Sequence, residues 1–364
     1  MRIITLRLKD FRLFDEAELR LGPGMNLLLG DNGGGKTSVL EAVHLLSRGR
    51  SFRGGAREAL IRQGERELQV FTELETASGS KRLGLARSAA GLSARLNERA
   101  LDPLSDLFQH CKAVCFEPGS HVLIAGGSEP RRELIDWGVF HVEPDFLANW
   151  RRYQRALRQR NHLLKAQGGD SALSAFEWEM ASSGLILARH RENYLAGLLK
   201  EIPLVAGELM REFGPPTLRW QNGWPTSEAL DVEGVAASLA SQREADRQRG
   251  HTRFGPHRAD WSLGFEAIGQ REHFSRGQQK LAALLMVLSQ AQMHARIEGE
   301  WPILLLDDLG SELDRGHCSA LLDWVQGSGA QSLLSATRVD TLALSPSHQA
   351  QLFHVEQGQV RSDN

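Results

Sequence analysis

The stretch Gly30-Asp31-Asn32-Gly33-Gly34-Gly35-Lys36-Thr37 fits the phosphate-loop pattern G-x-x-x-x-G-K-[ST]. The apolar run at 25–29 predicts a strand before it, and the apolar spacing of 38–46 predicts a helix behind it. Glycines allow successive backbone N–H groups to turn inward around phosphates, and a helix start adds a partial positive charge. We therefore expect the loop and Ser38 to bind a nucleoside triphosphate, with Lys36 on the β- and γ-phosphates and Thr37 on Mg²⁺.

A second motif, Trp301-Pro302-Ile303-Leu304-Leu305-Leu306-Asp307-Asp308, ends in two carboxylates. Its apolar run predicts a buried strand in a parallel sheet, and the carboxyl ends of such strands are where α/β sheets bind ligands. Asp307 is suited to hold Mg²⁺, and Asp308 to orient or deprotonate the attacking water. A strand followed by a polar turn is the alternative interpretation, but a phosphate loop in the same chain favours the catalytic one.

A third motif, Ser275-Arg276-Gly277-Gln278-Gln279-Lys280, lies between these two and precedes an apolar helix predicted at 281–291. Serine is a good N-cap, and Gly277 near a helix start leaves N–H groups open to an anion. In isolation the hexapeptide would indicate a capped helix and nothing more. Its position between the phosphate loop and the acidic strand favours a role at the nucleotide.

Length and composition limit the class of protein. The 364 residues are 41% hydrophobic and 24% charged, which predicts a packed protein with one large and one smaller domain. No apolar run is as long as a membrane span, and the first residues alternate like a strand rather than a signal peptide. Cys111, Cys115 and Cys318 fit neither a zinc site nor a disulfide framework, so we expect a cytoplasmic protein. With a net charge of -2, any DNA contacts must come from local basic patches or from a groove formed on assembly.

The pattern along the chain predicts an α/β domain that a helical domain interrupts. Short strands at 68–75, 82–87 and 92–97 predict an antiparallel meander beside the nucleotide site. Helical patterns at 144–201, broken at 167–170, and at 235–248 predict the helical domain. The predicted boundaries are 1–135 and 251–364 for the α/β domain and 136–250 for the insertion.

The order of the three motifs resembles that of the ABC-type P-loop ATPases, and the G-x-N-G-x-G-K form of the loop, with Asn32, is similar to the Rad50/SMC/RecF group. Within this group, the chain resembles the RecF family over essentially its full length. The resemblance rests on Phe11-Arg12, Gly49-Arg50-Ser51-Phe52-Arg53, Arg131-Arg132, Leu157-Arg158-Gln159-Arg160-Asn161, Gly255-Pro256-His257-Arg258 and the strand at 332–337. It implies an ABC-type ATPase domain with an antiparallel meander and a helical lever-arm domain.

The resemblance also implies a composite site in which two protomers enclose two ATP molecules. The loop of one protomer would hold each nucleotide, and Ser275, Gly277 and Gln278 of the other would close on its γ-phosphate. The segment 311–314 would form the loop that crosses the dimer seam. Thr337 stands where other ABC ATPases place a switch histidine, so it is a candidate sensor of the γ-phosphate.

The function that the resemblance implies is ATP-dependent binding of gapped, junction or single-stranded DNA in recombinational repair and replication restart. ATP closure would clamp the DNA, the protein would work with RecO and RecR to load RecA and would act in SOS signalling, and slow hydrolysis would reset it. Candidate DNA contacts are the arginines Arg50, Arg53, Arg131, Arg132, Arg151, Arg152, Arg155 and Arg158. For the four on the predicted helix, a solvated helix face is an equally good explanation.

Four alternatives compete with this interpretation. A transporter ATPase would need a closer LSGGQ match and a switch histidine, and an SMC or Rad50 protein would need a much longer heptad insertion. An ATP-switched DNA-binding module without significant turnover, or another SMC-like ATPase, remains compatible with the motifs. Asp308 supports the first of these, because it reaches less far than the usual Glu.

The chain departs from the RecF pattern in two places. Residues 117–121 read Glu-Pro-Gly-Ser-His, whereas the family pattern has an acidic pair after the proline and a final leucine. We therefore assign no water-positioning role to this segment. Ala259 stands where the family often has a second aspartate, which leaves Asp260, and His257 could contact phosphate or DNA or be structural.

Overall fold

The computed structural model describes residues 1–54, 57–225 and 231–363, and they form two compact units. Unit 1 comprises Met1–His121, Glu201–Gly214 and Phe274–Asn364, and unit 2 comprises Val122–Lys200 and Pro215–His273. These boundaries differ from the predicted 135/136 and 250/251, because 122–135 and 251–273 pack with the helices and 201–214 packs with the α/β part.

A mainly parallel sheet in unit 1 positions the phosphate loop. The strand order is β15-β14-β3-β13-β12-β8, and only β15 is antiparallel to its neighbour. The strands are β3 (Met25–Leu29), β8 (Ala113–Phe116), β12 (Ile303–Leu306), β13 (Ser332–Ala336), β14 (Ala350–Glu356) and β15 (Gln359–Ser362). Every residue of β3, β12 and β13 is buried, which confirms the prediction made from the apolar runs at 25–29 and 301–306. Because the carboxyl ends of parallel strands share an edge, the residues after β3, β8, β12 and β13 come together there.

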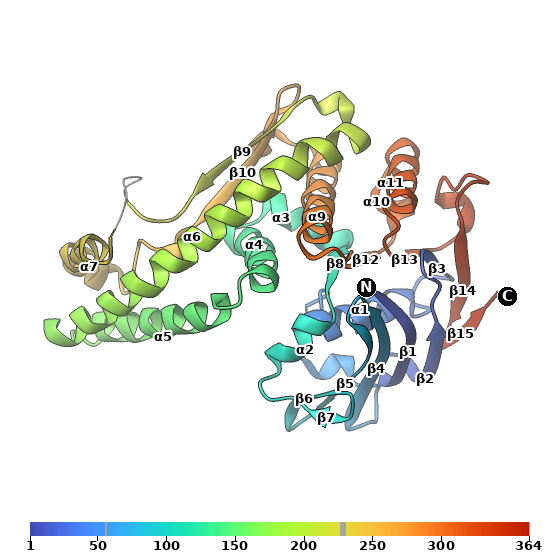
Figure 1. Cartoon of the computed structure of the whole chain (residues 1–364), viewed down its shortest axis with the longest axis horizontal. Helices are drawn as coiled ribbons and strands as arrows, with labels where there is room; N and C mark the ends of the chain where they lie inside the picture. Colours follow the sequence, from blue (N-terminus) through green and yellow to red (C-terminus); the bar gives the residue numbers. More distant parts are fainter. Residues whose placement is uncertain (55–56, 226–230, 364) are drawn as a thin grey trace. The chain divides into compact units, whose positions relative to one another are not determined.

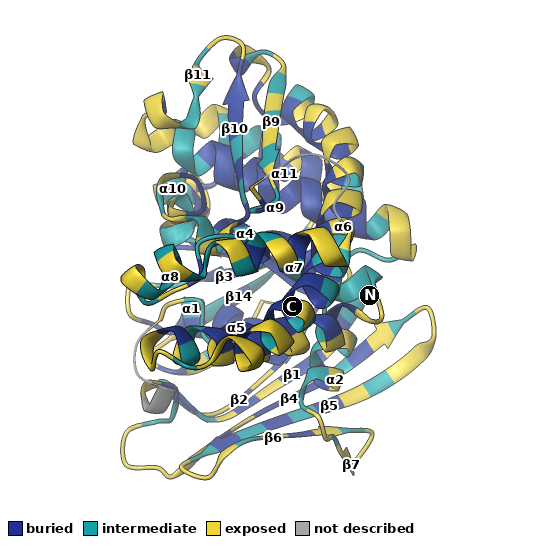
Figure 2. Ribbon diagram, turned by 90° about the vertical axis from the view of Figure 1, so that its left-hand side faces the viewer, coloured by how far each residue is buried: buried dark blue, intermediate teal, exposed yellow. Residues whose placement is uncertain are grey.

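An antiparallel sheet in unit 1 has the order β2-β1-β4-β5-β6-β7. Its strands are β1 (Arg2–Phe11), β2 (Phe14–Arg20), β4 (Glu67–Thr76), β5 (Gly79–Ser88), β6 (Gly91–Leu96) and β7 (Arg99–Ala100). The meander is therefore confirmed, and the N-terminal hairpin extends it. Buried and exposed residues alternate along these strands, as the bands in Figure 2 show. One apolar core joins this sheet, helix α1 (Lys36–Arg48) and the parallel sheet.

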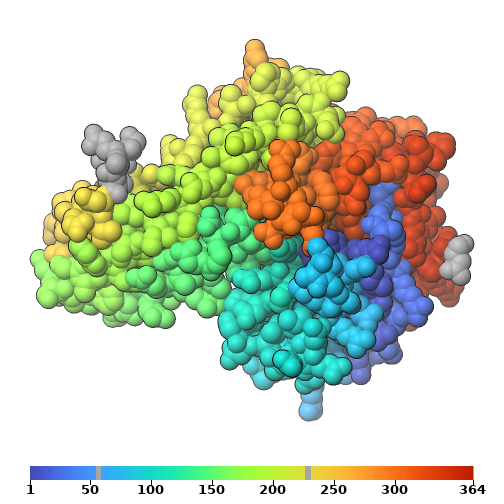
Figure 3. Space-filling view, viewed as in Figure 1, coloured from blue at the N-terminus to red at the C-terminus, as the bar shows by residue number. Residues whose placement is uncertain are grey.

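Further helices complete unit 1. They are α2 (Ser105–His110), α9 (Arg276–Glu298), α10 (Leu309–Glu312) and α11 (Arg315–Ser328), with 3₁₀ helices η1 (Arg57–Leu60), η2 (Pro118–His121), η3 (Arg211–Phe213) and η6 (Val339–Thr341). Helix α9 is buried along most of its length, and its last turn reaches the surface, where it is orange in Figure 3. Among the described residues, no helix combines the length and apolarity needed to cross a membrane.

Unit 2 combines helices with a small antiparallel sheet, β11-β10-β9 (Figure 1). Its elements are α3 (Val122–Ala125), α4 (Ser128–Val142), α5 (Phe146–Lys165), α6 (Asp170–Leu209, to Lys200 in this unit), β9 (Pro216–Gln221), α7 (Val232–Ser241), α8 (Arg243–Arg249), η4 (Pro256–Arg258), β10 (Asp260–Phe265), β11 (Gly269–Gln270) and η5 (Arg271–His273). The predicted helix break at 167–170 is confirmed, whereas the helix predicted at 235–248 is two helices that meet at Gln242. The sequence did not predict β9, whose pairing with β10 places that strand in unit 2.

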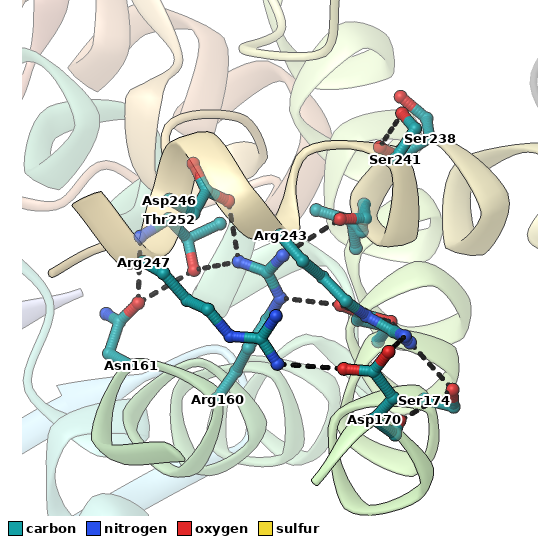
Figure 4. Close-up of polar contacts among 12 residues, drawn as sticks. Arg160, Asn161, Asp170, Ser174, Ser238, Ser241, Arg243, Asp246, Arg247 and Thr252 are labelled. Carbon is teal, nitrogen blue, oxygen red and sulfur yellow. Dashed lines mark hydrogen bonds and ion pairs between the residues drawn. The ribbon is translucent and has the colours of Figure 1, made fainter. Parts of the chain in front are cut away.

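A buried ion-pair network connects helices α5, α6 and α8 of unit 2 (Figure 4). Arg160 of α5 is 0% exposed and donates to Glu177 of α6 at 3.1 Å and to Asp246 of α8 at 2.8 Å. Its Nη1 also donates to the hydroxyl of Thr252, which in turn donates to Asn161. Breaking a buried pair by removing one partner costs about 3–5 kcal/mol. The 157–161 segment that contributed to the family resemblance therefore stabilises the fold.

Two other segments of the resemblance meet in the same unit. Arg131 is 2% exposed and makes a bidentate ion pair with Asp260, at 2.6 and 3.0 Å. His257 accepts from or donates to the Tyr153 hydroxyl through Nδ1, at 2.6 Å, and its Nε2 lies 3.1 Å from the carbonyl of Thr252. Since a carbonyl can only accept, Nε2 carries the proton and Nδ1 accepts from tyrosine. The prediction that Arg131 contacts DNA is therefore wrong, because its guanidinium is buried and paired with Asp260. His257 has a structural role, since both of its ring nitrogens are bonded within the unit.

Candidate nucleotide site

The phosphate loop has a positive φ, which glycine adopts without strain, at Gly30, Gly33 and Gly35. Gly30 has a φ of +151°, and a Cβ atom there would lie 2.1 Å from the carbonyl oxygen of Val355. Gly35 has a φ of +117° and is the last residue before α1. The loop therefore turns directly into the start of the helix, where free N–H groups can bind an anion.

The side chain of Lys36 packs back onto the phosphate loop. Its Nζ donates to the carbonyl oxygens of Gly30 and Asp31, at 2.7 and 2.9 Å. Burial lowers the pKa of Lys36, while Asp308, Asp307 and Asp31 act in the opposite direction. A bound phosphate would offer this ammonium stronger acceptors than two carbonyls.

Asp307, at the end of the acidic strand, contacts Thr37 of the phosphate loop, the other residue predicted to bind Mg²⁺. Its Oδ1 accepts from the Thr37 hydroxyl at 3.0 Å and from the Ser335 hydroxyl at 2.5 Å. Burial raises the pKa of this carboxyl, which is 3% exposed, and nearby Asp308 adds to the effect. Oδ2 has no hydrogen-bond donor in the described part of the chain, so it is open to a cation. Oxygen donors from a hydroxyl and a carboxylate suit a hard ion such as Mg²⁺.

Asp308 lies directly after β12 in a left-handed conformation, with φ 52° and ψ 43°. Its backbone N–H donates to the Ser335 hydroxyl at 2.9 Å, which fixes the turn. A left-handed conformation is strained for a residue other than glycine, and such strain persists where the surroundings determine it. Ser335 thus orients the Asp307 carboxylate and holds the backbone turn at Asp308, a role that the sequence did not reveal.

A cavity of about 780 Å³ brings most of the predicted nucleotide residues together. From the predicted set it is lined by Asn32, Gly33, Gly35, Lys36, Thr37, Ser38, Asp307 and Asp308. Residues that the sequence analysis did not assign to it are Arg12, Leu13, Phe52, Ala59, Ile61, Gln63, Glu117, Pro118 and Ser335. Arg53, a predicted DNA contact, also lines this cavity.

Three residues of the predicted loop fall outside this lining, and so do Thr337 and the three residues of the Ser275 motif that were predicted to contact the γ-phosphate. Gly30 and Asp31 act through their carbonyls on Lys36, while Asp31 and Gly34 line a second cavity of about 930 Å³ beside β14 and β15. Ser335, two residues before Thr337, takes the position at the cavity. The register between β12 and β13 explains this, because Leu306 pairs with Leu334 and Ser335 therefore lies beside Asp307.

The start of α9 carries the third motif. Ser275 accepts from the Gln278 N–H at 3.3 Å, and the Gln278 side chain accepts from the Ser275 N–H at 2.8 Å, which confirms the N-cap. Ser275 and Gly277 are exposed and do not line the nucleotide cavity. Lys280 makes a 2.7 Å ion pair with Glu312, so the signature helix is tied to the segment at 311–314.

Glu117 follows β8 at the same sheet edge and lines the nucleotide cavity. Its Oε2 accepts from the Gly119 N–H at 2.6 Å. Burial raises the pKa of Glu117, and the nearby Asp307 adds to the effect. The segment that departs from the family pattern therefore contributes an acidic side chain to the cavity.

The remaining arginines of unit 2 differ in how far they are engaged. Arg151, Arg155 and Arg158 are exposed on α5. Arg152 is paired with Glu179 at 2.7 Å. Arg132 is half-buried and donates to the Ser128 hydroxyl and to the carbonyl of Ala259.

Comparison with known proteins agrees with this arrangement. The family model of the RecF/RecN/SMC N-terminal domain matches residues 2–361. The DNA replication and repair proteins RecF of Stenotrophomonas maltophilia and Xanthomonas axonopodis pv. citri are 44% and 45% identical to the chain over 365 aligned residues, which cover 99% of this chain and 99% and 98% of those proteins. The chain belongs to the RecF family. It is thus an ABC-type ATPase family member connected with DNA replication and repair.

Solved structures of RecF support the same conclusion. The recombination mediator protein RecF-ATP in the RecFOR pathway is similar with a TM-score of 0.88 at 27% identity, covering 100% of this chain and 97% of that one. RecF-ATPrS has the same TM-score at 26% identity and is covered to 98%. An Smc head bound to the C-winged helix domain of ScpA has a TM-score of 0.59 at 14% identity, which shows a likeness of fold alone.

Proposed function

We propose that the chain binds ATP and Mg²⁺ and that a second copy of the chain completes its nucleotide site. The observation that carries this proposal is the separation of the motifs. The loop, Thr37 and Asp307 line one cavity, whereas the exposed helix start at Ser275 and Gly277 does not reach it in the same chain. An exposed helix N-terminus is a site for an anion, and the γ-phosphate of a nucleotide held by another copy would satisfy it.

The bound metal would supply charge stabilisation of the β- and γ-phosphates. Thr37 and Asp307 are the residues that would hold it, and Ser335 orients Asp307 for this task. Lys36 would leave the loop carbonyls for the phosphates, and Asp308 would orient or deprotonate the attacking water. Hydrolysis would remove the contact between the γ-phosphate and Ser275, and so would open the dimer.

The dimer would act on DNA. Exposed Arg151, Arg155 and Arg158 on α5 are the remaining candidates for the phosphate backbone, together with Arg50, and recognition would be largely independent of sequence. Because the related RecF structures are described within the RecFOR pathway, we extend to this chain the partnership with RecO and RecR on gapped or junction DNA and the loading of RecA. The protein would act in the cytoplasm, on the nucleoid.

Sedimentation velocity of the full chain with Mg²⁺ and either ATP or ADP tests this proposal. We expect dimers in ATP and monomers in ADP. Lys36→Met should abolish nucleotide binding, and Ser275→Arg should leave ATP binding intact but prevent dimers. Ser78→Arg, at an exposed serine in the turn between β4 and β5, is the matched control and should dimerise normally. Unchanged dimers in Ser275→Arg would refute the composite site.

A second candidate function is an ATP-switched DNA-binding module without significant turnover. The observation that favours it is the short side chain of Asp308 at the position of the catalytic base. In this version the nucleotide would close the dimer, and exchange rather than hydrolysis would open it.

A further inference from the structure

Glu41 is a carboxylate buried within the nucleotide-binding half of the molecule. It lies on α1, four residues after Thr37, and it is 0% exposed. Its oxygens accept from Arg12, through Nε at 2.8 Å and Nη2 at 2.6 Å, and from the hydroxyl of Ser51. An unpaired carboxylate would be strongly unfavourable in this buried position. The positive charge of Arg12 therefore balances the negative charge of Glu41.

Arg12 is held in one position by several bonds. Its φ of 57° is unusual for a residue other than glycine, which indicates that the surroundings determine the conformation. Its backbone N–H donates to the carbonyl of Leu60, and its Nη1 donates to the carbonyl of Ala59, both at 2.8 Å. Together with the bidentate pair to Glu41, these bonds fix the plane of the guanidinium.

The held guanidinium still has hydrogen-bond donors for a ligand. Arginine has five N–H groups, and the described residues use three of those on Arg12, in the bonds to Glu41 and Ala59. One N–H on each terminal nitrogen remains. The side chain is 19% exposed and lines the nucleotide cavity, so a ligand there can meet these two groups.

The part of the cavity around Arg12 differs chemically from the phosphate loop. Leu13, Ala59 and Ile61 line it with apolar atoms, and Gln63 adds an amide. Apolar surface with a few polar groups is typical of sites that bind the uncharged part of a ligand. Lys36 and the loop glycines, in contrast, offer positive charge and N–H groups to phosphates.

Resting on the proposed function, we infer that Glu41 is a positioning residue that holds Arg12 so that its two free N–H groups contact the ribose and base of the nucleotide rather than its phosphates. The balancing charge of Glu41 makes Arg12 a fixed hydrogen-bond donor. Without it, Arg12 would lose the two bonds that fix the plane of its guanidinium, and its free N–H groups would no longer be held in one direction.

Calorimetric titration of the full chain with ATP and with inorganic tripolyphosphate, both with Mg²⁺, tests this inference. In Glu41→Gln, the Kd for ATP should rise about tenfold, as expected for lost hydrogen bonds, while the Kd for tripolyphosphate stays within about twofold. A purely structural role would weaken both ligands together. Equal losses for both ligands, or an unchanged Kd for ATP, would overturn the inference.

A double variant and a control variant complete this experiment. If Glu41→Gln does not fold, the double variant Arg12→Leu with Glu41→Leu buries no charge and should show the same selective loss of ATP. Glu18→Gln, which breaks an exposed pair with Arg7 outside the cavity, is the control and should bind both ligands normally. A wild-type chain that binds neither ligand would refute the proposed function itself, and a wild type that binds both with the Glu41 variants unchanged would refute only the role of Glu41.

Discussion

The hydroxyl of Ser335 donates a hydrogen bond of 2.5 Å to Oδ1 of Asp307. The same hydroxyl oxygen accepts from the N–H of Asp308, so one side chain of β13 contacts both acidic residues that follow β12. Side chains that orient a metal ligand commonly matter almost as much as the ligand itself.

Ser335→Ala should slow ATP hydrolysis by about 10-fold to 100-fold, because Asp307 would lose one of its two orienting hydrogen bonds. Binding of ATP to the phosphate loop should change little. Thr337→Ala is the matched comparison, since Thr337 lies outside the cavity lining and should retain most activity. Steady-state phosphate release measures both variants, and a larger loss in Thr337→Ala would restore the sequence-based assignment of the sensor.

Asp308→Asn should reduce hydrolysis roughly 100-fold or more, as expected when a general base is removed, and should leave ATP-dependent dimers that persist longer. Single-turnover hydrolysis together with sedimentation measures both effects. If wild type and variant turn over equally slowly, the switch without significant turnover is the better description.

The triple variant Arg151→Ala, Arg155→Ala, Arg158→Ala should weaken DNA binding in the ATP state. The slope of log Kd against log salt should fall by up to about 3, because each lost phosphate contact changes it by about 1. Arg152→Ala is the control, since Glu179 already neutralises that charge. Fluorescence anisotropy on duplex and gapped DNA measures the slope, and an unaltered slope in the triple variant would place the DNA surface elsewhere.

The stability of the protein should fall as the pH drops from about 6.5 toward 4, partly because of His257. Burial lowers the pKa of His257 to about 4 in the folded state, so the unfolded chain takes up a proton in this window and the folded chain does not. His257→Gln keeps a donor for the Thr252 carbonyl but cannot titrate. Urea unfolding at several pH values should show a smaller loss for His257→Gln than for wild type, and equal losses would contradict the assignment.

Sequence patterns were sufficient for the elements that carry the motifs. The strand before the loop, the antiparallel meander and the capping of α9 by Ser275 were predicted from apolar spacing and local chemistry, and the structure confirms each. These features depend on neighbours in sequence, which explains the success. The comparisons also confirm the RecF family and the ABC-type fold.

The remaining features depend on contacts between distant segments. Ser335 reaches Asp307 only through the register of β13 on β12, and Arg12 reaches Glu41 only through packing of the N-terminal hairpin on α1. Arg131 was a candidate DNA contact because no acidic residue close to it in sequence indicates an ion pair. Its partner, Asp260, lies 129 residues away. Likewise β9 begins with a proline and has no fully buried residue, and its place in a sheet depends on its pairing with β10.

Complementation between two inactive variants tests the composite site most directly. A mixed dimer of Lys36→Met and Ser275→Arg has two different nucleotide sites. One site contains both substitutions. The other contains neither, because it is formed by the intact loop of the Ser275→Arg chain and the intact Ser275 of the Lys36→Met chain. Each variant alone should fail to hydrolyse ATP, and mixing them should restore hydrolysis at one of the two sites. No activity at any mixing ratio, with both variants folded, would contradict the claim that each nucleotide site is shared between two copies of this chain.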